Sequence, residues 1–228
     1  MTRRRIAFAL TPILAVAIAA PVSTQGVGVH PVTGRSIAQV MGHQGADWLD
    51  RPEREDEEAP TRAIALLDLV PGNVVADFGA GSGYMTVRLA RVVGPSGRVF
   101  AVDIQPEMLA LLQARVDREK LTNVTPVLSA TDDPRLPDHS LDLVLMVDVY
   151  HELSQPQVVL RHLKQALKTS GRLVLLEYRK EDPSIPIRPE HKMSVADAKA
   201  ELAAEGFALA RVKEDLPRQH ILIFTPVP

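Results

Sequence analysis

From about residue 60 onward, short runs of apolar residues alternate with segments whose apolar residues recur every three or four positions. The short runs predict strands at 74–78, 98–103, 124–129, 141–147 and 172–178. The periodic segments predict helices at 62–69, 84–93, 105–119, 156–168 and 194–205. Two further strands, 207–214 and 219–225, are separated only by a short turn and predict a hairpin. This order predicts an α/β fold: a doubly wound, seven-stranded, mostly parallel sheet with a C-terminal antiparallel hairpin.

The first predicted strand ends in a glycine-rich turn. Asp77 lies at the end of the strand, and Gly79, Gly81 and Gly83 follow at every second position before the next helix. Such a turn sets backbone N–H groups and a helix N-terminus against a ligand. The dinucleotide fingerprint G-x-G-x-x-G would need glycine at position 84, where this chain has Tyr84. A P-loop would need Gly-Lys-Ser/Thr, and no lysine is nearby.

The next predicted strand also ends in an acid, Asp103, which is followed by Ile104. In nucleotide-binding α/β sheets an acid at this strand tip accepts hydrogen bonds from ribose hydroxyls. Asp103 also precedes a first helical turn that contains Pro106, so it could cap that helix. Ribose binding and helix capping need the same position at the strand end, so the sequence allows both roles for Asp103.

The turn, with its acid two residues ahead, resembles motif I of the class I S-adenosylmethionine (SAM) methyltransferases, and the resemblance covers nearly everything from about residue 60. Segments 48–55, 145–152 and 218–220 are similar to an uncharacterised bacterial type 11-like subgroup. The resemblance implies a Rossmann-like methyltransferase fold, SAM as the cofactor and a small-molecule methyl acceptor. The cofactor-binding residues that it implies are Asp77, Gly79, Gly81, Gly83, Asp103 and Ile104.

The ends of the third and fourth strands supply further candidates. In this family an acid after the third strand hydrogen-bonds the adenine amino group, and Asp132 and Asp133 come a few residues later than usual. The choice between them is open, as is a purely structural Asp-rich turn. Asp148, Tyr150 and His151 follow the fourth strand, where the family exposes the SAM methyl group, and we take them as catalytic candidates. His151 titrates near neutral pH and is the candidate base, with a packing role as the alternative.

The predicted fifth strand ends in Glu177, which flanks the same mouth, and segment 189–194 is expected to run across it. His191 and Lys192 in that segment could bind an anionic acceptor or be solvated. Ser194 is expected to cap the following helix, with Asp197 in its first turn.

Composition narrows the function classes. The formal charge of −2 and the lack of a basic stripe predict no nucleic-acid partner. The chain has no cysteine, which excludes thiolate metal sites, disulfides and a cysteine nucleophile, and we predict no metal site. Two alternatives to a methyltransferase remain: a SAM-binding protein without catalysis, and an NAD-dependent reductase, which Tyr84 and the lack of a Tyr-x-x-x-Lys motif disfavour. The sequence indicates no oligomeric state.

The N-terminus has the features of a secretory signal. Arg3, Arg4 and Arg5 precede an apolar run at 6–20. That run is roughly 15 residues long, shorter than the span of about 20 that a bilayer needs. Small residues at Ala17 and Ala19 fit a cleavage site. We predict a signal peptide at 1–20 and export to the periplasm, with membrane contact only through the signal. The alternative is a cytoplasmic protein translated from Met41.

Two segments separate the signal from the methyltransferase domain, which we place at 60–228. Residues 21–45 are rich in Gly, Pro, Ser, Thr and Gln and predict a linker or a loosely docked arm. Residues 46–59 hold the only tryptophan, Trp48, and dense mixed charge, which predicts an amphipathic helix. That helix either packs Trp48 and Leu49 on the domain or forms a lid with Trp48, Arg51 and Glu55 near the substrate.

Overall fold

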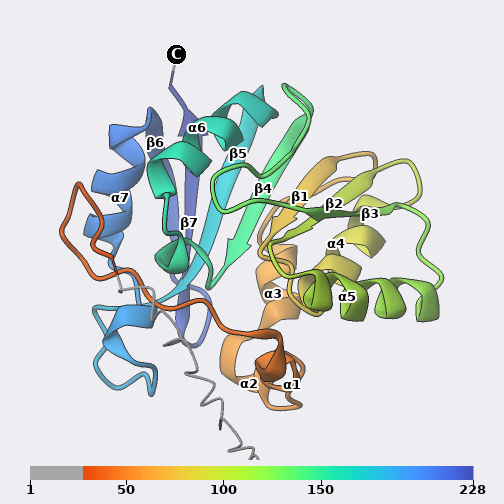
Figure 1. The fold of residues 1–228 in the computed structure, drawn as a ribbon, viewed down its shortest axis with the longest axis horizontal. Coiled ribbons are helices and arrows are strands. Elements are labelled where there is room, and N and C mark those ends of the chain that lie inside the picture. Colours follow the sequence, from red (N-terminus) through yellow and green to blue (C-terminus); the bar gives the residue numbers. More distant parts are fainter. Residues whose placement is uncertain (1–27, 228) are drawn as a thin grey trace, which may run out of the picture.

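The computed structural model describes residues 28–227, so the predicted signal at 1–20 lies outside the described part. Its centre is a seven-stranded sheet in the order β3-β2-β1-β4-β5-β7-β6 (Figure 1). The strands are β1 Val74–Phe78, β2 Arg98–Asp103, β3 Val124–Leu128, β4 Leu141–Val147, β5 Leu167–Tyr178, β6 Phe207–Lys213 and β7 Gln219–Pro226. Only the pairings of β7 with β5 and with β6 are antiparallel. The predicted fold is confirmed.

The central strands are apolar along most of their length because helices cover both faces of the sheet. Val75 of β1 pairs with Val99 of β2 on one side and with Leu143 of β4 on the other. β5 begins at Leu167, earlier than the predicted residue 172, and its register with β4 shifts near Leu141. The parallel pairing brings the carboxyl ends of β1, β2, β4 and β5 to one edge of the sheet.

The five predicted helices are all present. They are α3 Pro60–Ala65, α4 Tyr84–Val93, α5 Pro106–Arg118, α6 Pro156–Ala166 and α7 Val195–Ala204. α3 and α4 share a hydrophobic core with β1, β4, β5 and β7, while α6 and α7 belong to a second core that includes other side chains of the same strands. α7 begins as predicted, because the Asp197 N–H donates to Ser194 Oγ at 3.0 Å. The predicted helix 62–69 is shorter at its end, since Asp68 has a φ of 54°.

The N-terminal segment lies across the carboxyl ends of the parallel strands. It contains two short helices, α1 Ala46–Leu49 and α2 Arg54–Glu58, next to that edge of the sheet (Figure 1). Upstream, Arg35 docks the chain on α7: its Nε and Nη2 donate to the two carboxylate oxygens of Glu201 at 2.8 and 3.0 Å. No helix in residues 28–227 is long and apolar enough to cross a membrane.

Candidate active site

The glycine turn between β1 and α4 has a backbone that only glycine adopts easily. Gly79, Gly81 and Gly83 all have positive φ values, of 76°, 53° and 83°. All three positions are also close-packed. A Cβ at Gly79 would overlap the side chain of Val149, and one at Gly81 would lie 2.8 Å from Cδ1 of Leu49. The alternating glycines therefore serve both the shape of the turn and the close approach of other groups.

Asp103 ties the end of β2 to this turn. Its Oδ2 accepts from the Gly81 N–H at 2.9 Å, and its Oδ1 accepts from the Gln105 N–H at 2.9 Å, next to the start of α5. Burial raises the pKa of the Asp103 carboxyl, and these backbone N–H donors partly offset the effect. Asp103 is not the N-cap of α5, because that residue is Gln105, but its carboxylate holds the turn and keeps lone-pair capacity for a ribose hydroxyl. Ile104 beside it is 39% exposed.

Asp77 lies under the turn and is almost fully buried. Its Oδ2 accepts from Thr86 Oγ1 at 2.6 Å. Burial is the largest effect on the carboxyl and raises its pKa to about 6, against the Thr86 hydrogen bond and the positive charge of Arg54. Asp77 is thus a buried acid whose charge state responds to mildly acidic pH.

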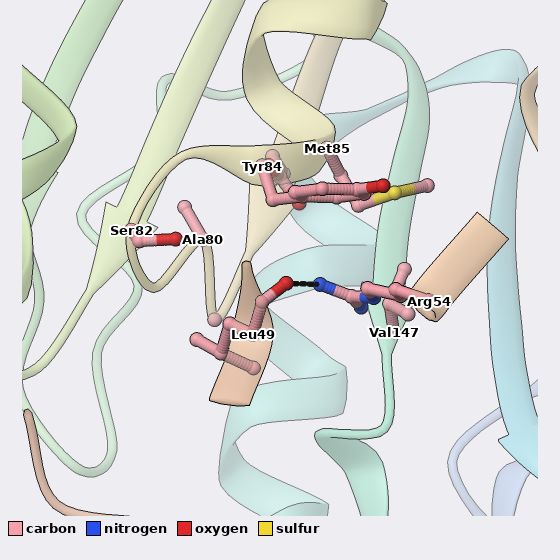
Figure 2. Close-up of a pocket in the computed structure, with 9 residues that line it drawn as sticks. Leu49, Arg54, Ala80, Ser82, Tyr84, Met85 and Val147 are labelled. Carbon is pink, nitrogen blue, oxygen red and sulfur yellow. Dashed lines mark hydrogen bonds between the residues drawn. The ribbon is translucent and has the colours of Figure 1, made fainter. Parts of the chain in front are cut away.

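Leu49 and Arg54 of the N-terminal segment lie against the glycine turn (Figure 2). A cavity of about 30 Å³ remains, lined on one side by the turn and Tyr84 and on the other by Leu49 and Arg54. Cofactor pockets measure roughly 300–1,000 Å³. The turn and Asp103 have the donors and acceptors that SAM needs, but Leu49 has to move away before a molecule of that size can enter.

Polar contacts hold this cover in place. Asp50, at the end of α1, accepts from Ser82 Oγ at 3.1 Å and forms an ion pair with Arg115 of α5. Arg54 Nη1 donates to the Leu49 carbonyl oxygen at 2.8 Å. Arg51 stacks over Trp48, which is 42% exposed and therefore faces solvent rather than the core. Leu49 is thus the apolar side chain of α1 that reaches the turn.

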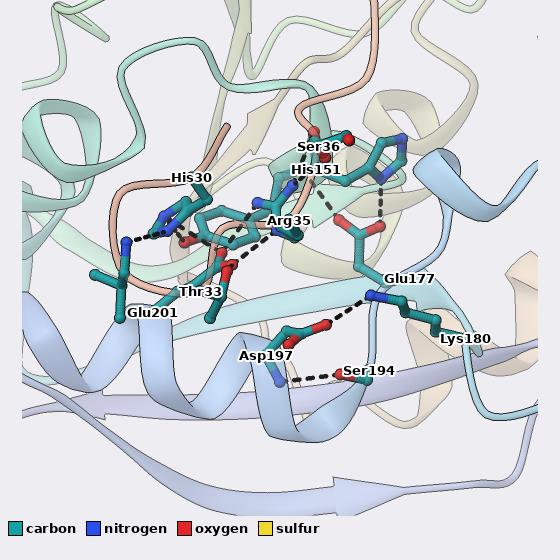
Figure 3. A network of polar contacts seen from close by, with 12 residues as sticks. His30, Thr33, Arg35, Ser36, His151, Glu177, Lys180, Ser194, Asp197 and Glu201 are labelled. Atoms are coloured by element: carbon teal, nitrogen blue, oxygen red, sulfur yellow. Dashed lines mark hydrogen bonds and ion pairs between the residues drawn. The ribbon is translucent and has the colours of Figure 1, made fainter. Parts of the chain in front are cut away.

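On the neighbouring strand ends, His151 and Glu177 form a buried pair (Figure 3). His151 Nδ1 lies 2.6 Å from Glu177 Oε2, and both side chains are almost fully buried. Val147 of β4 is in register with Leu176 of β5, which brings the residues that follow close together. Burial lowers the pKa of the His151 imidazole, but the Glu177 carboxylate more than reverses this, and the net pKa is raised. With Nδ1–H donated to Glu177, neutral His151 keeps a lone pair on Nε2.

Two more side chains approach this Nε2 atom. It lies 3.1 Å from Nδ1 of His191 and 4.0 Å from Oε1 of Glu152. Burial raises the pKa of the Glu152 carboxyl to about 7, although the positive charge of His151 opposes the shift. Glu177 was expected to flank this mouth, and His191 was expected either to bind an anionic acceptor there or to be solvated, whereas no role was expected for Glu152.

The side chains of the other two catalytic candidates, Tyr150 and Asp148, lie in different surroundings from that of His151. The Tyr150 hydroxyl is buried 3.4 Å from His30 Nε2, on the side of the N-terminal segment and α7 rather than beside His151 Nε2. This placement does not fit the predicted catalytic role, because the hydroxyl faces a packed cluster. Asp148 has a φ of 53°, and its Oδ2 accepts from Gln219 at 2.7 Å. Burial, reinforced by Glu58 and Glu177, raises its pKa well above the ordinary value.

The two acids after β3 are both exposed. Asp133 stabilises its own turn, since its Oδ1 accepts from the Arg135 N–H at 2.8 Å and its carbonyl oxygen accepts from the Ala130 N–H at 2.9 Å. Asp132 is therefore the better placed of the two for an adenine contact, which remains a prediction.

Comparisons with known proteins agree with this geometry. Residues 75–171 match the family described as "Methyltransferase domain". A structure titled as a SAM-dependent methyltransferase from Aquifex aeolicus superposes with a TM-score of 0.77 at 28% identity, covering 83% of this chain and 100% of that one. Residues 75–171 thus match a methyltransferase domain, and the described residues have the fold of a SAM-dependent methyltransferase. SAM is the cofactor of that family, and the glycine turn and Asp103 are the features that fit it.

The similarities to proteins with a more specific description cover a smaller part of the chain. The chain is 33% identical over 118 residues to a ubiquinone/menaquinone biosynthesis C-methyltransferase UbiE from Ectopseudomonas mendocina. The matched part is 51% of this chain and 46% of that protein. The chain thus spans about half the length of the curated relatives that it matches. A putative type 11 methyltransferase from Sulfolobus solfataricus shares the fold, with a TM-score of 0.61 at 22% identity, covering 75% of this chain and 94% of that one. The type 11-like subgroup stays a prediction.

Proposed function

We propose that this protein transfers the methyl group of SAM to a small-molecule acceptor at the mouth beside His151. The observation that supports this proposal most is that the glycine turn lies next to the segment that carries His151. Val149 packs on Gly79 of the cofactor turn, and His151 follows two residues later. A residue that can accept a proton therefore lies next to the place where the family binds SAM.

The residues suit a displacement reaction with proton removal. SAM, when bound, supplies a methyl group on a positively charged sulfur. Because in-line displacement depends chiefly on positioning, the walls of the mouth would contribute most by orienting the acceptor. His151 would accept the acceptor's proton at Nε2. Glu177 would hold the imidazole in the required tautomer and stabilise its protonated form.

The curated relatives indicate one class of methyl acceptor. The curated relatives that the chain matches include C-methyltransferases of ubiquinone and menaquinone biosynthesis, which makes an electron-rich ring carbon one candidate acceptor atom. Because the alignment covers only about half of each chain, the ring carbon is a candidate acceptor atom and not an assignment. A ring flanked by a hydroxyl would also give His151 a proton to remove, since loss of that proton increases the electron density on the ring.

The test is formation of S-adenosylhomocysteine, measured by mass spectrometry with hydroquinones, phenols, amines, thiols and a small-molecule extract of the native host. Asp103→Ala is the matched cofactor-site variant. Loss of hydrogen bonds to a charged acceptor should weaken SAM binding by about 1.5–3 kcal/mol. We expect at least one acceptor class to support turnover by the wild type and more weakly by Asp103→Ala. SAM binding in calorimetry without turnover in any arm would favour the non-catalytic SAM-binding alternative.

A further inference from the structure

We propose that His151, Glu152 and His191 bind one divalent transition-metal ion of the zinc type beside the acceptor mouth. Their ligand atoms converge: His151 Nε2 and His191 Nδ1 are 3.1 Å apart, and Glu152 Oε1 lies 4.0 and 3.9 Å from them. The sequence lacks cysteine and predicted no metal site. The three residues come together because the short helix Pro189–His191 contacts the short helix Tyr150–Glu152, which follows β4.

The spacing of these atoms is close to that of a zinc site. Zinc–nitrogen and zinc–oxygen bonds of about 2.0–2.2 Å at tetrahedral angles place ligand atoms about 3.3–3.5 Å apart. The two imidazole nitrogens, 3.1 Å apart, are slightly closer than that and would separate by a few tenths of an ångström around an ion. The Glu152 oxygen is slightly farther out, and small rotations of its flexible side chain would bring it in. Two histidines and one glutamate are the protein ligands of a known class of zinc site that leaves a fourth position open.

Glu177 supplies the second feature of a metal site. Ligating histidines almost always donate their other ring N–H to a carboxylate, a backbone carbonyl or water, which fixes the tautomer and orients the ring. The 2.6 Å contact of His151 Nδ1 with the fully buried Glu177 carboxylate has this form, and it directs the lone pair of Nε2 toward the other two ligands. Glu177 is itself held in place, because its Oε1 accepts from the Tyr150 N–H at 3.0 Å.

The charges around the cluster also favour a cation. Glu152 and Glu177 lie close together with little exposure, and their ion-pair partners among residues 28–227 are only His151 and His191. No lysine or arginine of the described chain pairs with either carboxylate. Buried carboxylates are normally compensated by a paired charge or by a metal ion.

The ligand set selects the class of ion. Imidazole nitrogens suit zinc, cobalt, nickel and copper, whereas magnesium and calcium prefer an all-oxygen shell. His191 keeps 29% of its side chain exposed, so an ion can reach the cluster from solvent. The ion would occupy the lone pair on His151 Nε2 that the proposed base uses, so metal binding and proton acceptance at this atom exclude each other. The site goes beyond the proposed function and does not depend on it.

The experiment is calorimetric titration of untagged, chelator-treated protein with Zn²⁺, with Mg²⁺ as the control ion. Co²⁺ replaces Zn²⁺ in a parallel optical measurement, because its d–d absorption reports tetrahedral nitrogen and oxygen ligation. We expect one Zn²⁺ per chain and no Mg²⁺ binding at matched concentration. His191→Ala and Glu152→Gln each remove one ligand and should weaken Zn²⁺ binding at least tenfold. Glu177→Gln, which removes the outer hydrogen bond of His151, should weaken it roughly ten- to hundredfold.

His162→Ala is the matched control, since His162 is an exposed histidine of α6 and is not one of the three converging ligands. It should bind Zn²⁺ like the wild type. Thermal unfolding without metal checks that each variant is folded. If Glu177→Gln misfolds, His191→Ala decides, because His191 is partly exposed at the end of the short helix Pro189–His191. Equal Zn²⁺ affinity of the wild type and His191→Ala would overturn the site, as would no binding by the wild type. Zn²⁺ binding by a protein without methyl transfer would instead contradict the proposed function and leave the site standing.

Discussion

The side chain of Leu49 packs directly on Gly81, so closely that a Cβ at Gly81 would lie 2.8 Å from Leu49 Cδ1. The first residue belongs to the N-terminal segment and the second to the cofactor turn. This contact closes the cofactor site in the structure described. SAM can enter only after α1 moves, so contacts that hold α1 should control how fast SAM binds.

Asp50→Ala tests this cover. The substitution removes the hydrogen bond from Ser82 and the ion pair with Arg115, and both anchor α1. We expect SAM to associate several-fold faster, with stopped-flow fluorescence of Trp48 as the readout, because Trp48 lies in α1 itself. Asp56→Ala, at an exposed position of α2, is the control and should leave the rate unchanged. Identical rates in all three proteins would show that α1 does not limit entry.

A second prediction concerns pH and Asp77. Its pKa is about 6 in the folded protein, against an ordinary value of 3.8, so between these values the folded state binds more protons than the unfolded state. The free energy of unfolding should therefore fall as pH rises through this window. A shift of roughly two units corresponds to about 3 kcal/mol at most.

Asp77→Asn separates this effect from other titrating groups. The variant keeps a hydrogen-bonding partner for Thr86 and cannot ionise. Relative to the wild type, its free energy of unfolding should increase by up to about 3 kcal/mol between pH 4 and pH 7, measured by urea denaturation without SAM. Parallel pH profiles of the two proteins would mean that Asp77 titrates normally.

The sheet and its helices could be predicted because each strand buries a run of apolar residues and each helix repeats its apolar face. The Gly79-x-Gly81-x-Gly83 spacing also predicted a turn of unusual backbone shape. The His151–Glu177 pair was within reach of the same reasoning, since two neighbouring parallel strands end beside each other. Only the adjacent register of Val147 and Leu176 was needed to see it.

The N-terminal cover could not be predicted in this way. Residues 21–45 have no apolar period, and their anchors lie far away in the chain: Arg35 binds Glu201, and the Met41 carbonyl accepts from Gln105 Nε2 at 2.9 Å. The contact between His191 and His151 could not be predicted for a similar reason. It reaches His151 only because the chain returns to Tyr178, where the Met193 N–H donates to the Tyr178 carbonyl oxygen at 3.0 Å. Long-range contacts of irregular segments leave no pattern in the local sequence.

Export remains a proposal, and the structure bears on its main alternative. Glu201 is buried, and three of its side-chain partners, His30, Thr33 and Arg35, precede Met41. A chain that began at Met41 would lose all three and leave a buried carboxylate short of compensation, which is strongly destabilising. We therefore expect N-terminal sequencing of envelope protein from the native host to give a mature start near Ala20. Intact residues 1–20 on cytoplasmic protein would contradict export.

The most direct test of the account compares His151→Asn with the wild type in chelated buffer, once an acceptor is found. The account predicts unchanged SAM affinity in calorimetry and turnover slower by about a hundredfold or more, because the proton acceptor is gone. Tyr150→Phe, which removes the hydroxyl beside His30, should keep turnover within about twofold of the wild type, since that group does not face the mouth. Undiminished turnover by His151→Asn would contradict the account, and so would a slow variant that has lost SAM binding and thermal stability together.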